Sequence, residues 1–248
     1  MPGHIYAHVD CASPYSYFAL LHLRRIRPLL STYNITISII PIFLGGINHA
    51  TGNKPPSTLP AKAKYGPYDM QRAVNHFGTV KLSAPPFFPM VSLLPQRCMC
   101  VLKARYSEEV FETVFERLWV WVFNKHVDLA KPENMKAVLI DGPELNEEQA
   151  DEIIRLAGTK EVKAELNENT RRCIEEYGAF GAPWLWVVDR RGKGEPVFGS
   201  DRWVYIYRLL GLRFEDVRLM KNVDGGEGST TEGGGVVGEN GGAGAAKL

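Results

Sequence analysis

The first forty residues combine two kinds of apolar pattern. Residues 4–9 form a short run of β-branched and aromatic side chains, which is typical of a buried strand. Apolar residues recur at helical spacing over 17–26, and this helix is expected to end before Pro28 or in the turn after it. Residues 34–41 alternate apolar and polar side chains as a second strand does. This order predicts a βαβ unit with parallel strands and a right-handed crossover.

The middle of the chain changes its pattern twice. Over 43–95, glycine, proline and polar residues dominate, which predicts long ligand-facing loops with a short helix at 69–76. Helical periodicity then returns in four segments: 96–105, 108–123, 146–157 and 159–177. The third of these opens with a capping signal at Asn146 and Gln149. Such a block between α/β pieces indicates a helical insertion.

The strand pattern resumes after the helical block. Residues 184–188 form a strongly apolar strand, 190–194 a hairpin turn and 196–198 a short partner strand. A last helix is expected to open at Ser200-Asp201 and to run to Leu210. The whole order is βαβ, helical insertion, ββα. It predicts an α/β protein with a thioredoxin-like fold and a helical domain inserted between its two halves.

These patterns divide the chain into three parts. Residues 1–45 and 178–215 are expected to form the thioredoxin-like domain, and 46–177 the ligand-facing loops and the inserted helical domain. The segment 222–248 holds ten of the 24 glycines and few large apolar groups, so it is expected to be a disordered tail. Its final Ala246-Lys247-Leu248 differs by one small residue from a peroxisomal address, which favours a peroxisomal import receptor as a partner. Cytosol is the alternative.

Composition and charge exclude several classes of function. The formal net charge of +1 offers no broad basic surface, so no nucleic-acid partner is expected. No apolar run is long enough for a membrane span, and no secretory signal opens the chain. The spacings of the four cysteines (Cys11, Cys98, Cys100 and Cys173) match no common zinc or disulfide pattern. We therefore expect no metal site and a reducing compartment.

The candidate chemistry lies in the sequence Ser13-Pro14-Tyr15-Ser16, where the first strand meets the first helix. The backbone N–H groups of a first helical turn have no intrahelical partners, so such a junction favours an anion, for example a thiolate. Ser13 and Pro14 are also a favoured way to begin a helix in any protein. The two roles are compatible, because a capping hydroxyl accepts through its oxygen and keeps a proton free to donate outward. Ser13 and Ser16 stand where thioredoxin-like oxidoreductases carry two cysteines, so internal dithiol exchange is excluded.

Four separated motifs support a more specific interpretation. They are Asp10 with SPYS at 13–16, GNKPP at 52–56 with Lys62 following, YGAFGAP at 177–183, and FGSDR at 198–202. In these motifs the chain resembles the kappa-class glutathione transferases, relatives of bacterial disulfide oxidoreductases and of 2-hydroxychromene-2-carboxylate isomerases. The order and spacing of the motifs match that family over most of residues 4–212.

The resemblance implies a glutathione site, with Ser13 as the group that hydrogen-bonds and stabilises the thiolate. Ala182-Pro183 would be a cis-proline loop whose backbone pairs with the cysteinyl part. Ser200 and Asp201 would hold the γ-glutamyl end, with a helix N-cap as their alternative role. Asn53 and Lys62 would reach the peptide part or the glycyl carboxylate. The implied binding residues are Ser13, Pro14, Tyr15, Asn53, Lys62, Ala182, Pro183, Ser200 and Asp201.

The function implied by the resemblance is conjugation of the glutathione thiolate to small hydrophobic electrophiles, with a compatible hydroperoxide-reducing activity. Glutathione would be a co-substrate, and no cofactor would be bound permanently. The family also implies a homodimer and a location in mitochondria or peroxisomes. Two alternatives stay open: a glutathione-dependent isomerase of the 2-hydroxychromene-2-carboxylate type, and a non-catalytic thioredoxin-fold binding module. Trp119 and Trp121 are expected to build the helical core or to line its inner face.

Overall fold

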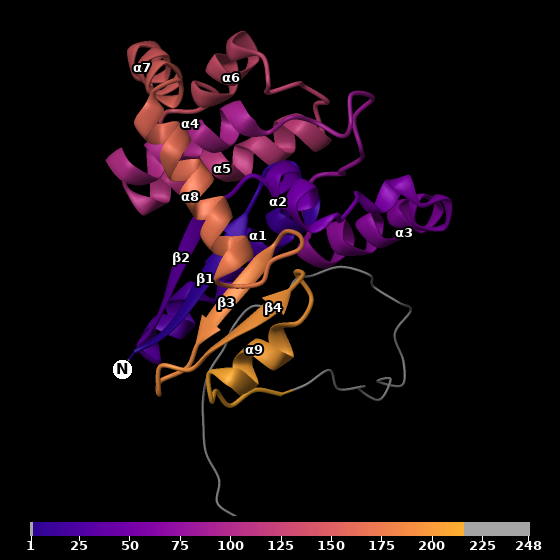
Figure 1. The fold of residues 1–248 in the computed structure, drawn as a ribbon, viewed down its shortest axis with the longest axis vertical. Helices are drawn as coiled ribbons and strands as arrows, with labels where there is room; N and C mark the ends of the chain where they lie inside the picture. Colours follow the sequence, from indigo (N-terminus) through magenta and orange to yellow (C-terminus); the bar gives the residue numbers. More distant parts are fainter. Residues whose placement is uncertain (1, 216–248) are drawn as a thin grey trace, which may run out of the picture. The chain divides into compact units, whose positions relative to one another are not determined.

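A four-stranded sheet forms the centre of the part of the chain that the computed structural model describes, residues 2–215. Its strands are β1 (Gly3–Val9), β2 (Ile35–Pro41), β3 (Trp184–Val188) and β4 (Gly194–Phe198). They lie in the order β2-β1-β3-β4 (Figure 1), with β1 and β2 parallel and the other pairs antiparallel. The predicted βαβ and ββα halves are therefore confirmed, and they meet where β1 pairs with β3.

Helices occupy both the crossover and the long segment between the two halves. They are α1 (Pro14–Thr32), α2 (Leu44–Thr51), α3 (Pro60–Phe77), α4 (Leu93–Arg105), α5 (Glu108–Phe123), α6 (Pro132–Leu139), α7 (Glu147–Ala157), α8 (Lys160–Glu175) and α9 (Trp203–Leu209), with a 3-10 turn η1 (Pro56–Thr58). Figure 1 shows α4, α5, α6 and α7 gathered beyond one end of the sheet, with α8 leading from this group back to the strands. No helix among the described residues is long and apolar enough to cross a membrane.

Three expectations need correction. The predicted loops at 43–95 are wrong over α2 and the first half of α3, because Pro60 begins α3 at its first helical position. The short helix predicted at 69–76 is confirmed as the second half of α3, which ends at a left-handed Gly78. The pattern also missed α6, a two-turn helix with Pro132 at its start. The last helix begins at Trp203 with Arg202 as its N-cap, so Ser200-Asp201 lies before the helix. For α1, the alternative that the helix ends in the turn after Pro28 is confirmed, because it ends at Thr32.

One continuous core joins the sheet to the helical segment. Ile5 and Ala7 of β1 belong to the same buried cluster as Phe18 of α1 and Phe115 of α5. The described residues up to Phe214 accordingly form a single compact unit. The expected tail at 222–248, with Ala246-Lys247-Leu248, lies outside the described residues. The shared core means that the helical segment directly supports the strand ends beside Ser13.

Candidate functional site

Ser13 lies at the junction of β1 and α1 and is the N-cap of that helix. Its backbone is extended, its Oγ accepts from the Ser16 N–H at 3.3 Å, and Pro14 occupies the first helical position. The side chain is nearly buried, with 5% of the residue exposed. The capping role is therefore confirmed. In the first turn of α1, Pro14 has no N–H and the Ser16 N–H is bonded to Ser13, so the Tyr15 N–H is the backbone donor there that has no partner among the described residues.

The Ser13 hydroxyl also reaches across the chain to the loop before β3. Its Oγ donates to the Ala182 carbonyl oxygen at 3.0 Å, although 169 residues separate the two in sequence. The Ala182-Pro183 peptide bond is cis. The expectation that the hydroxyl proton stays free to donate outward is therefore wrong for this structure, because that proton lies in the bond to Ala182.

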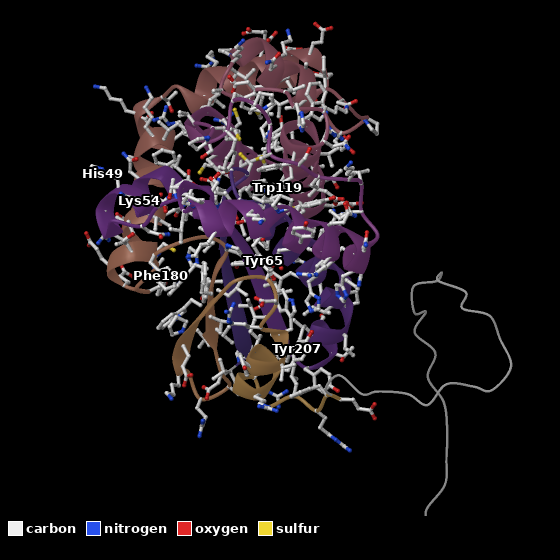
Figure 2. All side chains as sticks on the ribbon, turned by 90° about the vertical axis from the view of Figure 1, so that its right-hand side faces the viewer. His49, Lys54, Tyr65, Trp119, Phe180 and Tyr207 are labelled. Carbon is white, nitrogen blue, oxygen red and sulfur yellow. The ribbon has the colours of Figure 1, made fainter. Side chains whose placement is uncertain are left out.

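Two further loops meet the cis-proline loop. The Asn53 side-chain amide donates to the Phe180 carbonyl oxygen at 2.6 Å, and Figure 2 shows Lys54 and Phe180 on the same side of the molecule. The Gly199 N–H donates to the Pro183 carbonyl oxygen at 3.2 Å. Gly199 has a φ of +97°, a conformation that favours glycine. The structure thus joins all four sequence motifs through the cis-proline loop, which itself bonds to Ser13 at the start of α1.

Ser200 and Asp201 follow directly after Gly199. The Asp201 carboxylate lies 2.9 Å from the Arg202 guanidinium and is largely exposed, while the Ser200 carbonyl oxygen accepts from the Trp203 indole at 2.7 Å. Their alternative role as N-cap of the last helix is wrong, because Arg202 holds that position. Lys62 lies exposed in the first turn of α3 and makes no hydrogen bond or ion pair with any described residue.

Tyr15 connects the first turn of α1 to α3. Its hydroxyl donates to the Asp69 carboxylate at 2.6 Å. Burial, followed by the hydrogen bond to Asp69 and the nearby Asp201 charge, raises the pKa of Tyr15. The phenol therefore keeps its proton at neutral pH, so Tyr15 is a hydrogen-bonding group and is unsuited to act as a base.

A buried carboxylate holds this junction in place. Asp10 is fully buried, and its oxygens accept from the Ala12 N–H at 2.8 Å, the Leu44 N–H at 2.7 Å and the Ser92 hydroxyl at 2.8 Å. Burial raises the pKa of Asp10 to about 6, and the three hydrogen bonds oppose that rise. One side chain therefore links the end of β1, the start of α2 and the segment before α4.

Two residues of the helical segment also support the junction, and sequence reasoning did not assign them this role. The buried Gln96 amide donates to the carbonyl oxygens of Val9 at 2.8 Å and Ile42 at 2.7 Å. The Trp119 indole donates to the Ser13 carbonyl oxygen at 2.9 Å and lies in the interior (Figure 2). The core role predicted for Trp119 is confirmed. Trp121 instead lies partly exposed, with its indole bonded to Asp141.

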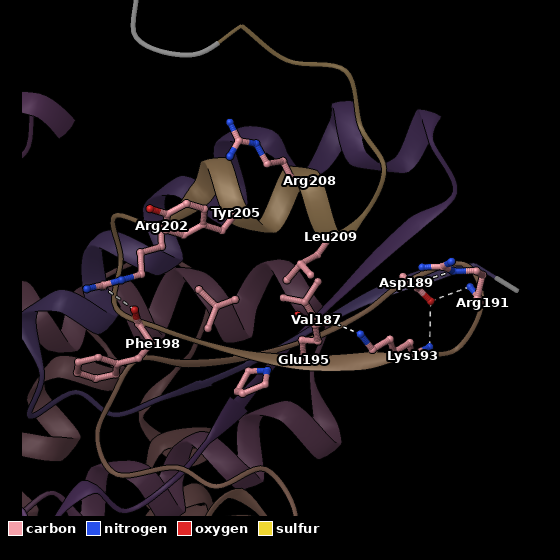
Figure 3. A pocket seen from close by; sticks show the side chains of 12 residues that line it. Val187, Asp189, Arg191, Lys193, Glu195, Phe198, Arg202, Tyr205, Arg208 and Leu209 are labelled. Carbon is pink, nitrogen blue, oxygen red and sulfur yellow. Dashed lines mark hydrogen bonds and ion pairs between the residues drawn. The ribbon is translucent and has the colours of Figure 1, made fainter.

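A separate groove runs between β4 and α9 (Figure 3). It has a volume of about 520 Å³ and includes Phe198 and Arg202 of the FGSDR motif. Three of its cations lie in ion pairs: Arg191 with Asp189, Lys193 with Glu195, and Arg202 with Asp201. Ser13, Asn53 and Ala182 do not line it. The groove therefore adjoins the junction without forming it.

Comparison with known proteins matches this geometry to a family. The family model described as DSBA-like thioredoxin domain matches residues 4–210. Glutathione S-transferase kappa 1 of Homo sapiens is 29% identical over 86% of this chain and 93% of its own length. Glutathione S-transferase kappa 2 of Caenorhabditis elegans is 31% identical over 83% of this chain and 91% of its own length. The chain belongs to the kappa class of glutathione transferases.

Solved structures place this kappa-class chain among DsbA-like folds. A 2-hydroxychromene-2-carboxylate isomerase superposes with a TM-score of 0.64 at 20% identity, covering 84% of this chain and 94% of the isomerase. A putative protein disulfide isomerase from Nitrosomonas europaea superposes with a TM-score of 0.62 at 16% identity, covering 85% and 97%. At these sequence identities the structural similarity confirms the fold. It does not distinguish a transferase from an isomerase.

Proposed function

We propose that this kappa-class protein is a glutathione transferase that binds the glutathione thiolate at the start of α1. The observation that carries the proposal is the convergence of Ser13, the Asn53 loop and the Gly199 loop on the cis-proline loop. The site offers the Ser13 hydroxyl, the Tyr15 backbone N–H and loop backbone within one small region. These groups suit a peptide that carries a thiolate.

Glutathione binding would break the hydrogen bond between Ser13 and Ala182 and form two new ones, one from each residue to the tripeptide. The Ser13 hydroxyl, which donates to the Ala182 carbonyl oxygen, would turn to the glutathione sulfur. The carbonyl oxygen so released would accept from the cysteinyl N–H of the tripeptide. Ser200 and Asp201 would hold the γ-glutamyl end, and Asn53 the peptide part. Lys62, or Lys54 directly after Asn53, would pair with the glycyl carboxylate.

Catalysis would rest on the stabilised thiolate and on its position. The Tyr15 N–H at the start of α1 and the Ser13 hydroxyl would lower the thiol pKa, so the thiol proton passes to solvent at neutral pH. The sulfur then attacks an electrophilic carbon, a C–S bond forms, and the leaving group departs with its electron pair. The electrophile would bind beside the thiolate, between the thioredoxin-like half and the helical segment.

The Ser13→Ala variant tests the thiolate role. Loss of one charge-assisted hydrogen bond, about 1.5–3 kcal/mol, should raise the pKa of bound glutathione by about one to two units. The thiolate absorbance of the complex, followed against pH, measures this value. Ser31→Ala, an exposed change in α1, is the matched control. An unchanged pKa in Ser13→Ala would leave Ser13 as a helix cap only.

Two measurements separate the alternatives. Titration calorimetry with glutathione should show binding, whereas a non-catalytic module that binds other ligands predicts none. Product analysis with a chlorinated nitrobenzene should show a stable conjugate, whereas an isomerase would regenerate free glutathione after each turnover. Reduction of an organic hydroperoxide, which consumes two glutathione molecules for each alcohol and water formed, tests the additional activity.

Assembly and location stay predictions. A homodimer, expected from the resemblance, is tested by light scattering coupled to gel filtration, where a monomeric mass would contradict it. Import into peroxisomes is tested with a fluorescent fusion that keeps or lacks Ala246-Lys247-Leu248. Unchanged import in the shortened fusion would contradict the address, and uptake by mitochondria would support the alternative location.

A further inference from the structure

A second cavity lies on the sheet face that points away from Ile5 and Ala7. Alternation along β1 directs Tyr6 and His8 to this face, where Tyr6 is the cross-strand partner of Trp186 in β3. The cavity has a volume of about 370 Å³ and is bounded on one side by α8. None of the residues proposed to bind glutathione lines it. It is therefore a separate candidate site.

Aromatic rings form the floor and wall of this cavity. The Tyr177 and Trp186 rings stack with centroids 4.8 Å apart, and the His4 and Tyr6 rings stack at 3.9 Å. Trp186 lies against Gly194 so closely that a Cβ there would stand 2.4 Å from the indole. The absence of that Cβ lets the indole lie flat on the sheet. Flat, partly exposed rings of this kind suit a planar aromatic ligand.

Polar groups lie at the α8 end of the cavity. The Arg172 guanidinium bonds to Glu176 through Nε at 3.2 Å and to the Tyr177 hydroxyl through Nη2 at 3.0 Å, while its Nη1 has no partner among the described residues. Asn169 lies one helical turn earlier and uses its amide N–H on the Pro41 carbonyl oxygen. The Arg172 Nη1 and the Asn169 amide oxygen are thus available to a ligand.

Two cations lie near His8 in the cavity, and one of them, Arg172, pairs with Glu176 through its Nε only. His8 is almost fully buried there, and burial together with the charges of Lys103 and Arg172 lowers its pKa to about 4. His8 is therefore neutral at neutral pH, and the charges that act on it are cationic. The Trp186 indole N–H also lacks a hydrogen-bond partner among the described residues, whereas Trp119, Trp121, Trp184 and Trp203 each have one. Charge and donors both favour an anion.

We propose that this cavity is a second binding site, for a planar aromatic carboxylate or sulfonate. The rings of the ligand would stack on Tyr6 and Trp186, and its anion would pair with Arg172 and accept from exposed N–H donors. This inference is independent of the proposed transferase function, since it shares no residue with the glutathione site.

Fluorescence titration of the full chain tests the proposal with two dyes of similar shape. Anilinonaphthalene sulfonate carries the anion, and N-phenylnaphthylamine does not. The sulfonate should bind saturably and more tightly than the neutral dye, in the presence of saturating glutathione as in its absence. Arg172→Gln should weaken the sulfonate about tenfold and leave the neutral dye unchanged. Tyr177→Leu should weaken both dyes.

Arg171→Gln is the matched control, because Arg171 lies beside Arg172 in α8 and shares Glu176 with it, but does not line the cavity and pairs mainly with Glu168 and Glu175. It should leave both affinities unchanged. Absence of saturable sulfonate binding would overturn the proposal, as would displacement of the dye by glutathione. An equal loss of sulfonate affinity in Arg171→Gln and Arg172→Gln would also overturn it. The sulfonate would then be attracted by the total positive charge of α8 and would not bind Arg172 specifically. Circular dichroism and the Tm of each variant check that its fold is intact.

Discussion

Asp10 shows how much of the site depends on single buried groups. Its carboxylate accepts from two backbone N–H groups and one hydroxyl that belong to three different segments. The carboxylate bonds to no residue proposed to bind glutathione, whereas the Asp10 backbone carbonyl oxygen accepts from the Ser13 N–H at 3.0 Å and so fixes the turn that ends at Ser13. Asp10 is therefore a positioning residue, and its main effect should appear in stability.

Asp10→Asn should change how stability depends on pH. Because burial raises the Asp10 pKa from 3.8 to about 6, the folded state binds this proton more tightly than the unfolded state does. The resulting stabilisation is complete below about pH 4 and is lost as the pH rises through about 6, a change of about 3 kcal/mol. The asparagine side chain does not titrate, so the variant should lack this component.

Urea unfolding of both proteins at pH 4, 5, 6 and 7 provides the measurement. The difference in free energy of unfolding, wild type minus variant, should fall across this range by about 3 kcal/mol. His8 and His22 have lowered pKa values, so their contribution to stability rises with pH, opposite to that of Asp10. They are present in both proteins, so their contribution cancels when the variant's free energy of unfolding is subtracted from that of the wild type. A difference that does not vary with pH would contradict the titration of Asp10.

Local signals in the sequence predicted the residues proposed for the site. The residues that support them were not predicted, because they lie far away in the sequence. Ser13 with Pro14 carries a helix-start signal, and the Ala182-Pro183 dipeptide belongs to a motif. Gln96 looked like any polar residue of an amphipathic helix, although it bonds to Val9, 87 residues away. The bond from Ser13 to Ala182 was equally hidden, because no local pattern predicts which acceptor a hydroxyl will reach.

Helices α1 and α5 are joined by an ion-pair cluster on the outer side of their shared core. The Glu112 side chain of α5 is 5% exposed and pairs with both Arg24 and Arg27 of α1. Burial raises the pKa of Glu112, and the two arginines oppose that rise. Since α1 presents Ser13 and α5 presents Trp119, this cluster connects the two helices that meet at the site.

Glu112→Gln should therefore destabilise the protein. The change removes the buried partner of two guanidinium groups, which keep the more exposed Glu116 and Glu108 as partners, and should cost roughly 1 to 2 kcal/mol. Chemical denaturation at neutral pH measures the loss. Glu109→Gln, an exposed change in the same helix, should alter stability by less than about 0.5 kcal/mol. Equal effects of the two changes would contradict a specific role of Glu112.

Elements with strong periodicity were predictable, and those with interrupted patterns were not. Helix α5 was predicted with its observed bounds, Glu108–Phe123, because its apolar stripe is continuous. Helix α3 contains Pro67 and has a single buried residue, Val74, so only its second half, at 69–76, was predicted as a helix and its first half resembles a loop. It becomes ordered through contacts such as that of Asp69 with Tyr15, which lie outside the segment.

At the scale of the whole molecule, sheet and helices share one core, so a ligand that binds at their junction should stabilise both together. Glutathione at 100 times its Kd should add about 2.7 kcal/mol and raise the Tm by roughly 5 to 10 °C. Scanning calorimetry with and without glutathione measures the shift. Asp201→Asn, which weakens the proposed hold on the γ-glutamyl ammonium, should reduce the shift at the same concentration. An undiminished shift would remove Asp201 from the site.

The burial of every cysteine protects the thiols of the protein from alkylation by electrophilic substrates. Cys11, Cys98, Cys100 and Cys173 are all inaccessible to solvent, and burial raises the pKa of each thiol, to about 12 for Cys100 and Cys173. Reactive compounds that a glutathione transferase handles would otherwise alkylate the catalyst itself. Here the protein offers no competing nucleophilic sulfur, and each turnover consumes a thiol that is replaced with the next tripeptide. The native chain should resist inactivation by iodoacetamide until it is unfolded.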